Sequence, residues 1–174
     1  MNDANLLRTP LYACHQKAGA RLVDFAGWEM PVQYSGVIDE HRAVRTAAGL
    51  FDVSHMGQVL IEGEGSAALL ESLVPVDVQA LAINQQTYAL FTTASGGVLD
   101  DLIITRWGEE QFFLVVNAGC KTQDIAHLRA HLSGQALTVL AEHALLALQG
   151  PAARAVMHTL CPQAAQLVFM HGCQ

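Results

Sequence analysis

Two neighbouring carboxylates stand inside an apolar stretch of this chain. Gly96 and Gly97 predict a turn, and residues 98–104 after them are apolar except for Asp100 and Asp101. Side chains alternate across a strand, so the two acids are expected on opposite faces of a sheet. An ionised carboxylate in a place poor in water needs a partner, a raised pKa or a chemical role. We take this strand as the candidate site, and a solvent-facing edge or turn position for one acid stays open as the alternative.

Three strands joined by short turns are predicted around these acids. They are expected at residues 88–93, 98–106 and 111–117 and form an antiparallel meander. On the third strand, alternation places Phe113, Val115 and Asn117 on one face. An apolar wall with one amide suits the binding of a flat heterocycle. Phe113 and Val115 fit ordinary core equally well, and Asn117 could instead cap the helix that is predicted to begin at Lys121.

The remaining elements mix helices with short strands. Helices are predicted at residues 11–17, 37–48, 66–74, 121–131 and 152–160. Further strands are predicted at residues 21–25, 50–54, 58–62, 137–141 and 145–148, with a strand-like run at 167–170. Residues 27–36 read as a loop because they contain Pro31 and two aromatic residues, Trp28 and Tyr34, which we expect in the core. This order favours an α+β fold, with antiparallel β-meanders and flanking helices, over a doubly wound parallel sheet.

Composition and charge exclude several classes of protein. The 174 residues are 52% apolar and 14% charged, which is enough to build a core in one domain or two small ones. A net charge of −7 argues against a nucleic-acid binder, whose affinity would rest on lysine and arginine. No apolar run approaches the about 20 residues of a membrane span. Residues 1–7 are polar and lack a secretory core, so we expect a cytoplasmic protein without a membrane partner.

The cysteines and histidines give no metal-site pattern. Cys14, Cys120, Cys161 and Cys173 form no C-x-x-C pair and are expected as reduced, mostly buried thiols. Two histidines, at positions 127 and 131, are four residues apart in a predicted helix, a spacing that can place two ligands on one face. No H-E-x-x-H pattern accompanies them, so we expect both to be solvated and predict no metal.

Five segments, in order along the chain, resemble one enzyme family. They are residues 9–34 (with TPLY and GARLVDFAGWEMPVQY), 39–56 (with DEH, VR and LFDVSHM), 96–103 (GGVLDDLI), 115–118 (VVNA) and 147–151 (ALQGP). Together they resemble the aminomethyltransferase of the glycine cleavage system, the T protein family. The resemblance implies a folate-binding aminomethyltransferase-like fold, and it places residues 1–174 in the N-terminal portion of the folate-binding domain, with the family's C-terminal barrel domain absent.

The resemblance also implies an activity and the residues that carry it. Members transfer a one-carbon unit from the aminomethyl-lipoyl arm of the H protein to tetrahydrofolate, release ammonia and give 5,10-methylenetetrahydrofolate. Asp101 matches the family's essential aspartate and is the expected catalytic residue. Asp100, on the opposite face of the strand, is not expected to be catalytic. The expected folate-binding residues are Met56, Tyr88, Asp101, Phe113, Val115 and Asn117. For Met56, a role as a core residue that fills a gap stays open.

Relatives of the same fold supply the alternatives. The chain could be a folate-dependent demethylase-type domain, a non-enzymatic folate-binding protein or an inactive fragment. Demethylating domains usually follow a flavin domain, and no dinucleotide-binding fingerprint precedes residue 9. The expected cofactor is tetrahydrofolate, the expected partner is the lipoylated H protein, and no metal is expected.

Overall fold

The computed structural model describes residues 6–174, which divide into two compact units. Unit 1 takes the described residues up to His55 together with residues 142–165, and unit 2 takes residues 56–141 and 166–174. Residues 1–5 of the polar N-terminal segment lie outside the described residues. Within residues 6–174, no helix combines the length and the apolar character that crossing a membrane requires.

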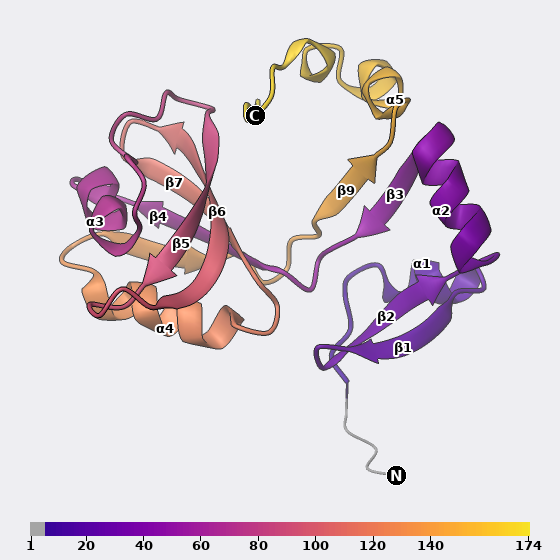
Figure 1. Ribbon diagram of the computed structural model, residues 1–174, viewed down its shortest axis with the longest axis horizontal. Helices are drawn as coiled ribbons and strands as arrows, with labels where there is room; N and C mark the ends of the chain where they lie inside the picture. The colour runs from indigo at the N-terminus through magenta and orange to yellow at the C-terminus, as the bar shows by residue number, and fades with distance from the viewer. Residues whose placement is uncertain (1–5) are drawn as a thin grey trace. The chain divides into compact units, whose positions relative to one another are not determined.

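Unit 2 is built on a five-stranded antiparallel sheet with strand order β5-β6-β7-β4-β8 (Figure 1). Its strands are β4 (Gly57–Glu62), β5 (Gln86–Thr92), β6 (Val98–Gly108), β7 (Gln111–Val116) and β8 (Ala136–Val139). Its helices are α3 (Ser66–Leu73) and α4 (Lys121–His131). Strands β5, β6 and β7 follow one another by short turns, so the predicted meander and the predicted α+β class are both confirmed.

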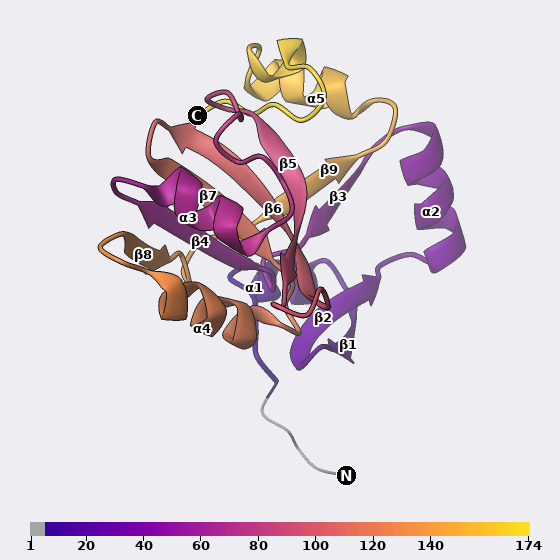
Figure 2. The ribbon, with the colours of Figure 1, turned by 60° about the vertical axis from the view of Figure 1, so that its left-hand side comes forward.

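One face of this sheet is covered by the two helices, which lie on the same side in both views (Figures 1 and 2). The core there joins Leu70 and Leu73 of α3 with Ile125 and Leu128 of α4. Sheet residues on this covered face include Val59, Ile61, Phe91, Leu102, Ile104, Leu114 and Val116. Alternation leaves the intervening side chains of β5, β6 and β7 on the opposite face, which we call the open face.

Unit 1 consists of two small antiparallel sheets with helices. Its elements are α1 (Tyr12–Lys17), β1 (Arg21–Phe25), β2 (Trp28–Gln33), α2 (Val37–Thr46), β3 (Gly49–Asp52), β9 (Leu146–Gln149) and α5 (Ala153–Leu160). Strand β1 pairs with β2, and β3 pairs with β9. A short 3₁₀ helix, η1 (Ala164–Gln166), follows α5.

Two predictions of local structure are wrong. Within residues 27–36, predicted as a loop, the chain forms β2, because Ala26 and Gly27 both take positive φ and make a two-residue turn from β1. Residues 167–170, predicted as a strand, contain a turn in which Met170 has a φ of 60°. The apolar residues there are largely exposed, and Phe169 is 87% exposed.

The cysteine and histidine predictions are corrected in part. No disulfide joins the four cysteines, all of which lie in the described residues, but Cys14 and Cys173 are exposed and the other two are half-buried. His127 is not solvated: its ring lies edge-on to Phe91 at a centroid distance of 5.2 Å, and its Nε2 atom is buried. His131, by contrast, is exposed, as predicted.

Candidate functional site

Five of the six predicted site residues lie on the three meander strands of unit 2 or directly after them. The strand register sets Tyr88 of β5 opposite Ile103 of β6, and Ile103 opposite Val115 of β7, so these three form a row across the open face. Phe113 lies two residues from Val115 and therefore shares this face. Tyr88 is 64% exposed, which leaves one side of its ring available for a ligand.

Asp101 and Asn117 meet at the end of this face. The Nδ2 atom of Asn117 donates to Oδ1 of Asp101 at 3.0 Å and to the Asp101 carbonyl oxygen at 3.1 Å. Asp101 itself is exposed. The side-chain amide therefore fixes one oxygen of a carboxylate whose other oxygen can face a ligand.

The acid that lies in a place poor in water is Asp100. It shares the covered face with Leu102 and Ile104, and its Oδ2 atom is buried without a partner among the described hydrogen bonds. Its Oδ1 atom accepts from the same Nδ2 of Asn117 at 3.2 Å. Asn117 is thus shared between the two neighbouring acids on opposite faces of β6.

A third acid, Asp124, was not predicted as part of the site. It lies in the first turn of α4 and is 1% exposed. Burial, followed by a hydrogen bond with Asp100 and the charges of Asp100 and Asp101, raises the pKa of Asp124 to about 7. Burial is also the main cause that raises the pKa of the Cys120 thiol, with Asp100 and Asp124 adding to it. The sequence signal was an acid at position i+3 from a helix start, which reads as an ordinary exposed first-turn acid.

Trp107 is a second residue that the sequence reasoning missed. Its ring stacks on Phe113 with centroids 4.4 Å apart and planes inclined by 2°. Strand alternation counted onward from Asp101 through Ile103 and Thr105 would have found it. The stacked pair adds a flat aromatic surface to the part of unit 2 that carries Val115.

Met56 lies directly before β4. Gly57, its neighbour, pairs with Val116, so Met56 is placed near the end of β7 where Asn117 follows. Met56 is half-buried, which fits both a ligand contact and a gap-filling core residue. A Cβ added at Gly57 would lie 2.5 Å from a Val116 methyl, and this close packing holds the two strands together at that end.

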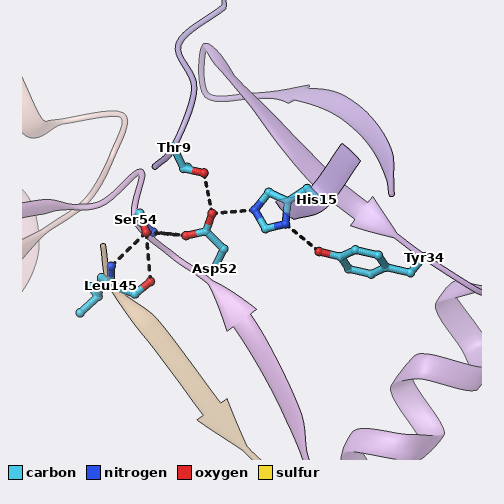
Figure 3. A network of polar contacts seen from close by, with 6 residues as sticks. All are labelled: Thr9, His15, Tyr34, Asp52, Ser54 and Leu145. Carbon is cyan, nitrogen blue, oxygen red and sulfur yellow. Dashed lines mark hydrogen bonds and ion pairs between the residues drawn. The ribbon is translucent and has the colours of Figure 1, made fainter. Parts of the chain in front are cut away.

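Unit 1 carries a separate polar network, drawn in Figure 3. Oδ2 of Asp52 accepts from Thr9 Oγ1 at 2.6 Å and from His15 Nε2 at 2.8 Å, and His15 Nδ1 lies 2.8 Å from the Tyr34 hydroxyl. Oδ1 of Asp52 accepts from the backbone and hydroxyl of Ser54. The Asp52 side chain is only 1% exposed.

The contacts of this network explain its electrostatics. Burial on its own would raise the pKa of Asp52, but the hydrogen bonds from Ser54, Thr9 and His15 together hold it below its ordinary value. Burial and the nearby Asp52 charge raise the pKa of Tyr34, so the phenol is not activated as a nucleophile. Because the oxygens of Asp52 accept from a residue of α1, a residue before α1 and a residue after β3, we interpret the network as structural.

A hollow of about 530 Å³ lies in the same unit and is lined by residues of β2, α2 and β3. Tyr34 lines it and is 43% exposed, so its predicted place in the core is wrong. Glu40 also lines it, but one oxygen of its carboxylate accepts from the backbone of Tyr34, Ser35 and Gly36, and these bonds lower its pKa. None of the six predicted site residues lines this hollow.

The two described units offer different chemistry. Unit 2 presents an exposed carboxylate, an oriented amide and aromatic rings on one sheet face, which suits a flat heterocycle with polar nitrogens. Among residues 6–174, no three His, Cys, Asp or Glu side chains are grouped so that they could hold a metal ion. The arrangement is that of an α+β protein that carries an exposed carboxylate beside aromatic rings on one face of its main sheet.

Comparison with known proteins identifies the family. Residues 11–174 match the GCVT N-terminal domain, and the chain belongs to this family. It is 52% identical over 160 residues to an aminomethyltransferase of Shouchella clausii, covering 91% of this chain and 44% of that protein. It is 51% identical over 155 residues to an aminomethyltransferase of Rubrobacter xylanophilus, covering 87% and 41%. The chain thus spans less than half of the length of these relatives.

A solved structure agrees with the sequence comparison. The crystal structure of glycine cleavage system aminomethyltransferase T from Bartonella henselae matches 96% of this chain with a TM-score of 0.91. The two are 44% identical in sequence, and the match covers 47% of the Bartonella chain. The family resemblance inferred from the five sequence segments is therefore confirmed.

Proposed function

We propose that this chain provides the folate-facing carboxylate of an aminomethyltransferase of the glycine cleavage system. The reaction takes the aminomethyl group from the lipoyl arm of the H protein, transfers its carbon to tetrahydrofolate and releases ammonia. The products are 5,10-methylenetetrahydrofolate and the reduced lipoyl carrier. The lipoylated H protein as partner, tetrahydrofolate as cofactor and a cytoplasmic location belong to the same proposal.

Asp101 is the catalytic residue in this proposal. An exposed carboxylate beside a folate can orient a ring nitrogen, accept its proton or stabilise a developing iminium carbon electrostatically. The contact that supports this role is the 3.0 Å bond from Asn117, which fixes one Asp101 oxygen and leaves the other for the ligand. Holding the two reactants close together in the correct orientation supplies much of the rate enhancement in such transfers.

The remaining proposed contacts form the wall of the pterin site. Tyr88 and Val115 lie in one row of the open face, and Phe113 lies next to Val115 on its strand. An exposed tyrosine and a stacked Trp107–Phe113 pair are surfaces on which a flat ring can lie. Met56 and Asn117 complete the set at the end of β7.

The proposal is tested by calorimetric titration of the folded chain with tetrahydrofolate. We expect saturable binding that Asp101→Asn weakens by at least about tenfold, the loss of one charge-assisted hydrogen bond. Glu64→Gln is the matched control, because Glu64 is an exposed acid of the same unit. The affinity of this variant for tetrahydrofolate should equal that of the parent chain. Absence of binding by the folded chain, or equal affinities for parent and Asp101→Asn, would overturn the proposed site.

The transfer step has its own assay. The chain is incubated with aminomethyl-loaded H protein and tetrahydrofolate, and ammonia and 5,10-methylenetetrahydrofolate are measured together. We expect the two products in equal amounts from the parent chain and neither from Asp101→Asn. Folate binding without either product would assign the chain to folate binding alone, the non-enzymatic alternative, and contradict the transferase proposal.

A further inference from the structure

The buried end of α4 contains a carboxyl group that the proposed reaction does not use. Asp124 is 1% exposed, and neither of its side-chain oxygens has a donor among the described groups. The Oδ2 atom of the neighbouring Asp100 is also buried. The Cys120 thiol and Asp124 are the two groups that hydrogen-bond to the Asp100 carboxyl group from the start of α4. An ionised carboxylate in such a place is costly, and two that face one another are more so.

A single proton shared between Asp124 and Asp100 removes the cost of burying two negative charges together. If Asp124 is a carboxylic acid, its O–H donates to the Asp100 carboxylate, and the pair carries one negative charge in place of two. Asp100 then keeps Oδ1 for the amide of Asn117, which lies 3.2 Å away. The same amide donates to Asp101 Oδ1 at 3.0 Å. A continuous path of side chains thus runs from α4 to the exposed carboxylate.

We propose that Asp124 is a positioning residue, which shares a proton with Asp100 and thereby holds the Asn117 amide on Asp101. Its importance for catalysis rests on the proposed function, in which Asp101 faces the folate. Asp124 touches neither substrate nor Asp101 in this role, and it acts through two intervening side chains. Loss of the proton would set two buried negative charges against one another and would displace Asp100 from Asn117.

The other titratable groups around the pair support a proton near neutral pH. The Cys120 thiol, at the start of α4, has a raised pKa and stays neutral, so it adds no charge to the pair. Burial lowers the pKa of Lys121 and of His127, two basic groups of the same helix, and so disfavours their charged forms. Asp101 adds a negative charge on the other face, which opposes ionisation of Asp124.

The experiment follows the side-chain amide of Asn117 by NMR in the complete chain. Its NH₂ hydrogen exchange is measured at pH 6 in the parent, Asp124→Asn and Asp124→Ala, and the Asp124 side-chain carbon is titrated in the parent. Asp124→Asn keeps a donor toward Asp100, whereas Asp124→Ala removes it. Gln123→Ala is the control, because Gln123 is an exposed neighbour on the same helix.

We expect exchange of the Asn117 amide to be at least about tenfold faster in Asp124→Ala than in the other three proteins. Above pH 7 the parent amide should exchange faster than that of Asp124→Asn at the same pH, because only the parent loses the shared proton. This second comparison stands even if Asp124→Ala does not fold. Equal exchange in parent and Asp124→Asn across pH 6 to 8.5, or ionisation of Asp124 below pH 5, would overturn the proposal.

Folate titrations of the same proteins separate this inference from the proposed function. We expect the tetrahydrofolate affinity of the parent to fall between pH 6 and 8.5 relative to that of Asp124→Asn. If the parent binds no folate, the proposed function fails, and the Asn117 exchange still decides whether Asp124 positions the amide. If folate binds and the Asn117 signals do not respond to Asp124, the positioning role alone is wrong.

Discussion

Asp124 shows how strongly a local preference can be overruled by burial. A carboxylate in the first helical turn is normally stabilised by the backbone N–H groups and the helix dipole. Here the side chain is 1% exposed and faces Asp100, and its pKa rises to about 7. The cost of burying the charge therefore exceeds the favourable position at the N-terminus of α4.

This raised pKa makes the stability of the parent depend on pH in a defined direction. The unfolded chain releases the Asp124 proton near pH 4, whereas the folded chain keeps it until about pH 7. The contribution of Asp124 to the free energy of unfolding therefore falls as the pH rises from about 4 to 7 and is constant above that. Asp124→Asn removes this dependence.

Urea unfolding of both proteins at pH 5, 6, 7 and 8 measures the effect. We expect the stability of Asp124→Asn relative to the parent to increase by at least about 1 kcal/mol between pH 5 and pH 8. The difference between the two proteins cancels the contributions of all other titrating groups. Parallel curves would show that Asp124 is ionised throughout and that the pair holds no proton.

The Asp52 network gives a prediction of opposite sign. The pKa of Asp52 is lower in the folded chain than in the unfolded chain, where it is near 4, so the ionised carboxylate stabilises the fold at higher pH. This contribution is lost as the pH falls through the pKa of Asp52 in the folded chain. Asp52→Asn should cost about 2 to 4 kcal/mol at pH 7, because it weakens a buried set of hydrogen bonds. In denaturant titrations below pH 4, the difference in the free energy of unfolding between Asp52→Asn and the parent should become smaller.

Two control variants, with smaller expected losses of stability, show whether the effect is specific to Asp52. Asp39→Asn removes an acid of α2 that is 78% exposed and should change the stability by less than about 0.5 kcal/mol. Tyr34→Phe removes only the hydroxyl beside His15 and should cost about 1 kcal/mol. A loss for Asp52→Asn no larger than that for Asp39→Asn would show that the network does not stabilise unit 1.

The candidate site could be predicted from the sequence only in part, for physical reasons that differ by residue. Alternation correctly separates Asp100 from Asp101, but it does not say which face the helices will cover. That depends on α4, whose Ile125 and Leu128 pack on the face that carries Asp100. Asp124 could not be found because its burial and its contact with Asp100 arise only when α4 lies on the sheet. The roles of the six predicted site residues stay predictions.

At the scale of elements, helices were predicted better than one of the hairpins. Apolar spacing located α2, α3 and α4, and Pro151 marked the start of α5, each to within two residues at either end. The β1–β2 hairpin was missed because its turn uses Ala26, a residue without a preference for positive φ. Pro31 pointed to a loop as well, but a two-stranded sheet has edges on which proline is tolerated.

The turn after β9 gives a prediction at this scale. Gly150 has a φ of 112°, and a Cβ there would lie 2.5 Å from the carbonyl oxygens of Ala47 and Val44. Gly150→Ala should therefore cost at least about 2 kcal/mol, from backbone strain and from steric overlap with fixed backbone atoms. Gly119→Ala is the control, because a Cβ at Gly119 meets nothing within 4 Å.

Thermal and urea unfolding of the two glycine variants compare these costs directly. We expect Gly119→Ala to be as stable as the parent within about 0.5 kcal/mol. A Gly150→Ala variant of parental stability would mean that the chain between β9 and α5 relaxes freely away from the end of α2.

At the scale of the whole molecule, the described chain divides into two compact units, and we expect a destabilising substitution in one unit to act mainly on that unit. Leu128 is fully buried in the core of unit 2, and Leu128→Ala should cost about 2 to 5 kcal/mol through lost burial and a cavity. Hydrogen exchange followed by mass spectrometry should then show a larger loss of protection in residues 56–141 than in residues 12–52. The reverse order should follow from Gly150→Ala, and equal losses everywhere in both variants would show one cooperative unit.

The pairing of β3 with β9 has a consequence for synthesis of the chain on the ribosome. Gly49 pairs with Gln149, so the two strands are about one hundred residues apart in the sequence, and the sheet of unit 2 is encoded between them. The partner of β3 is therefore translated only after all five strands of unit 2. The nascent chain can form the meander while the edge of β3 is still unpaired, and unit 1 can be completed only after the sheet of unit 2 has been translated.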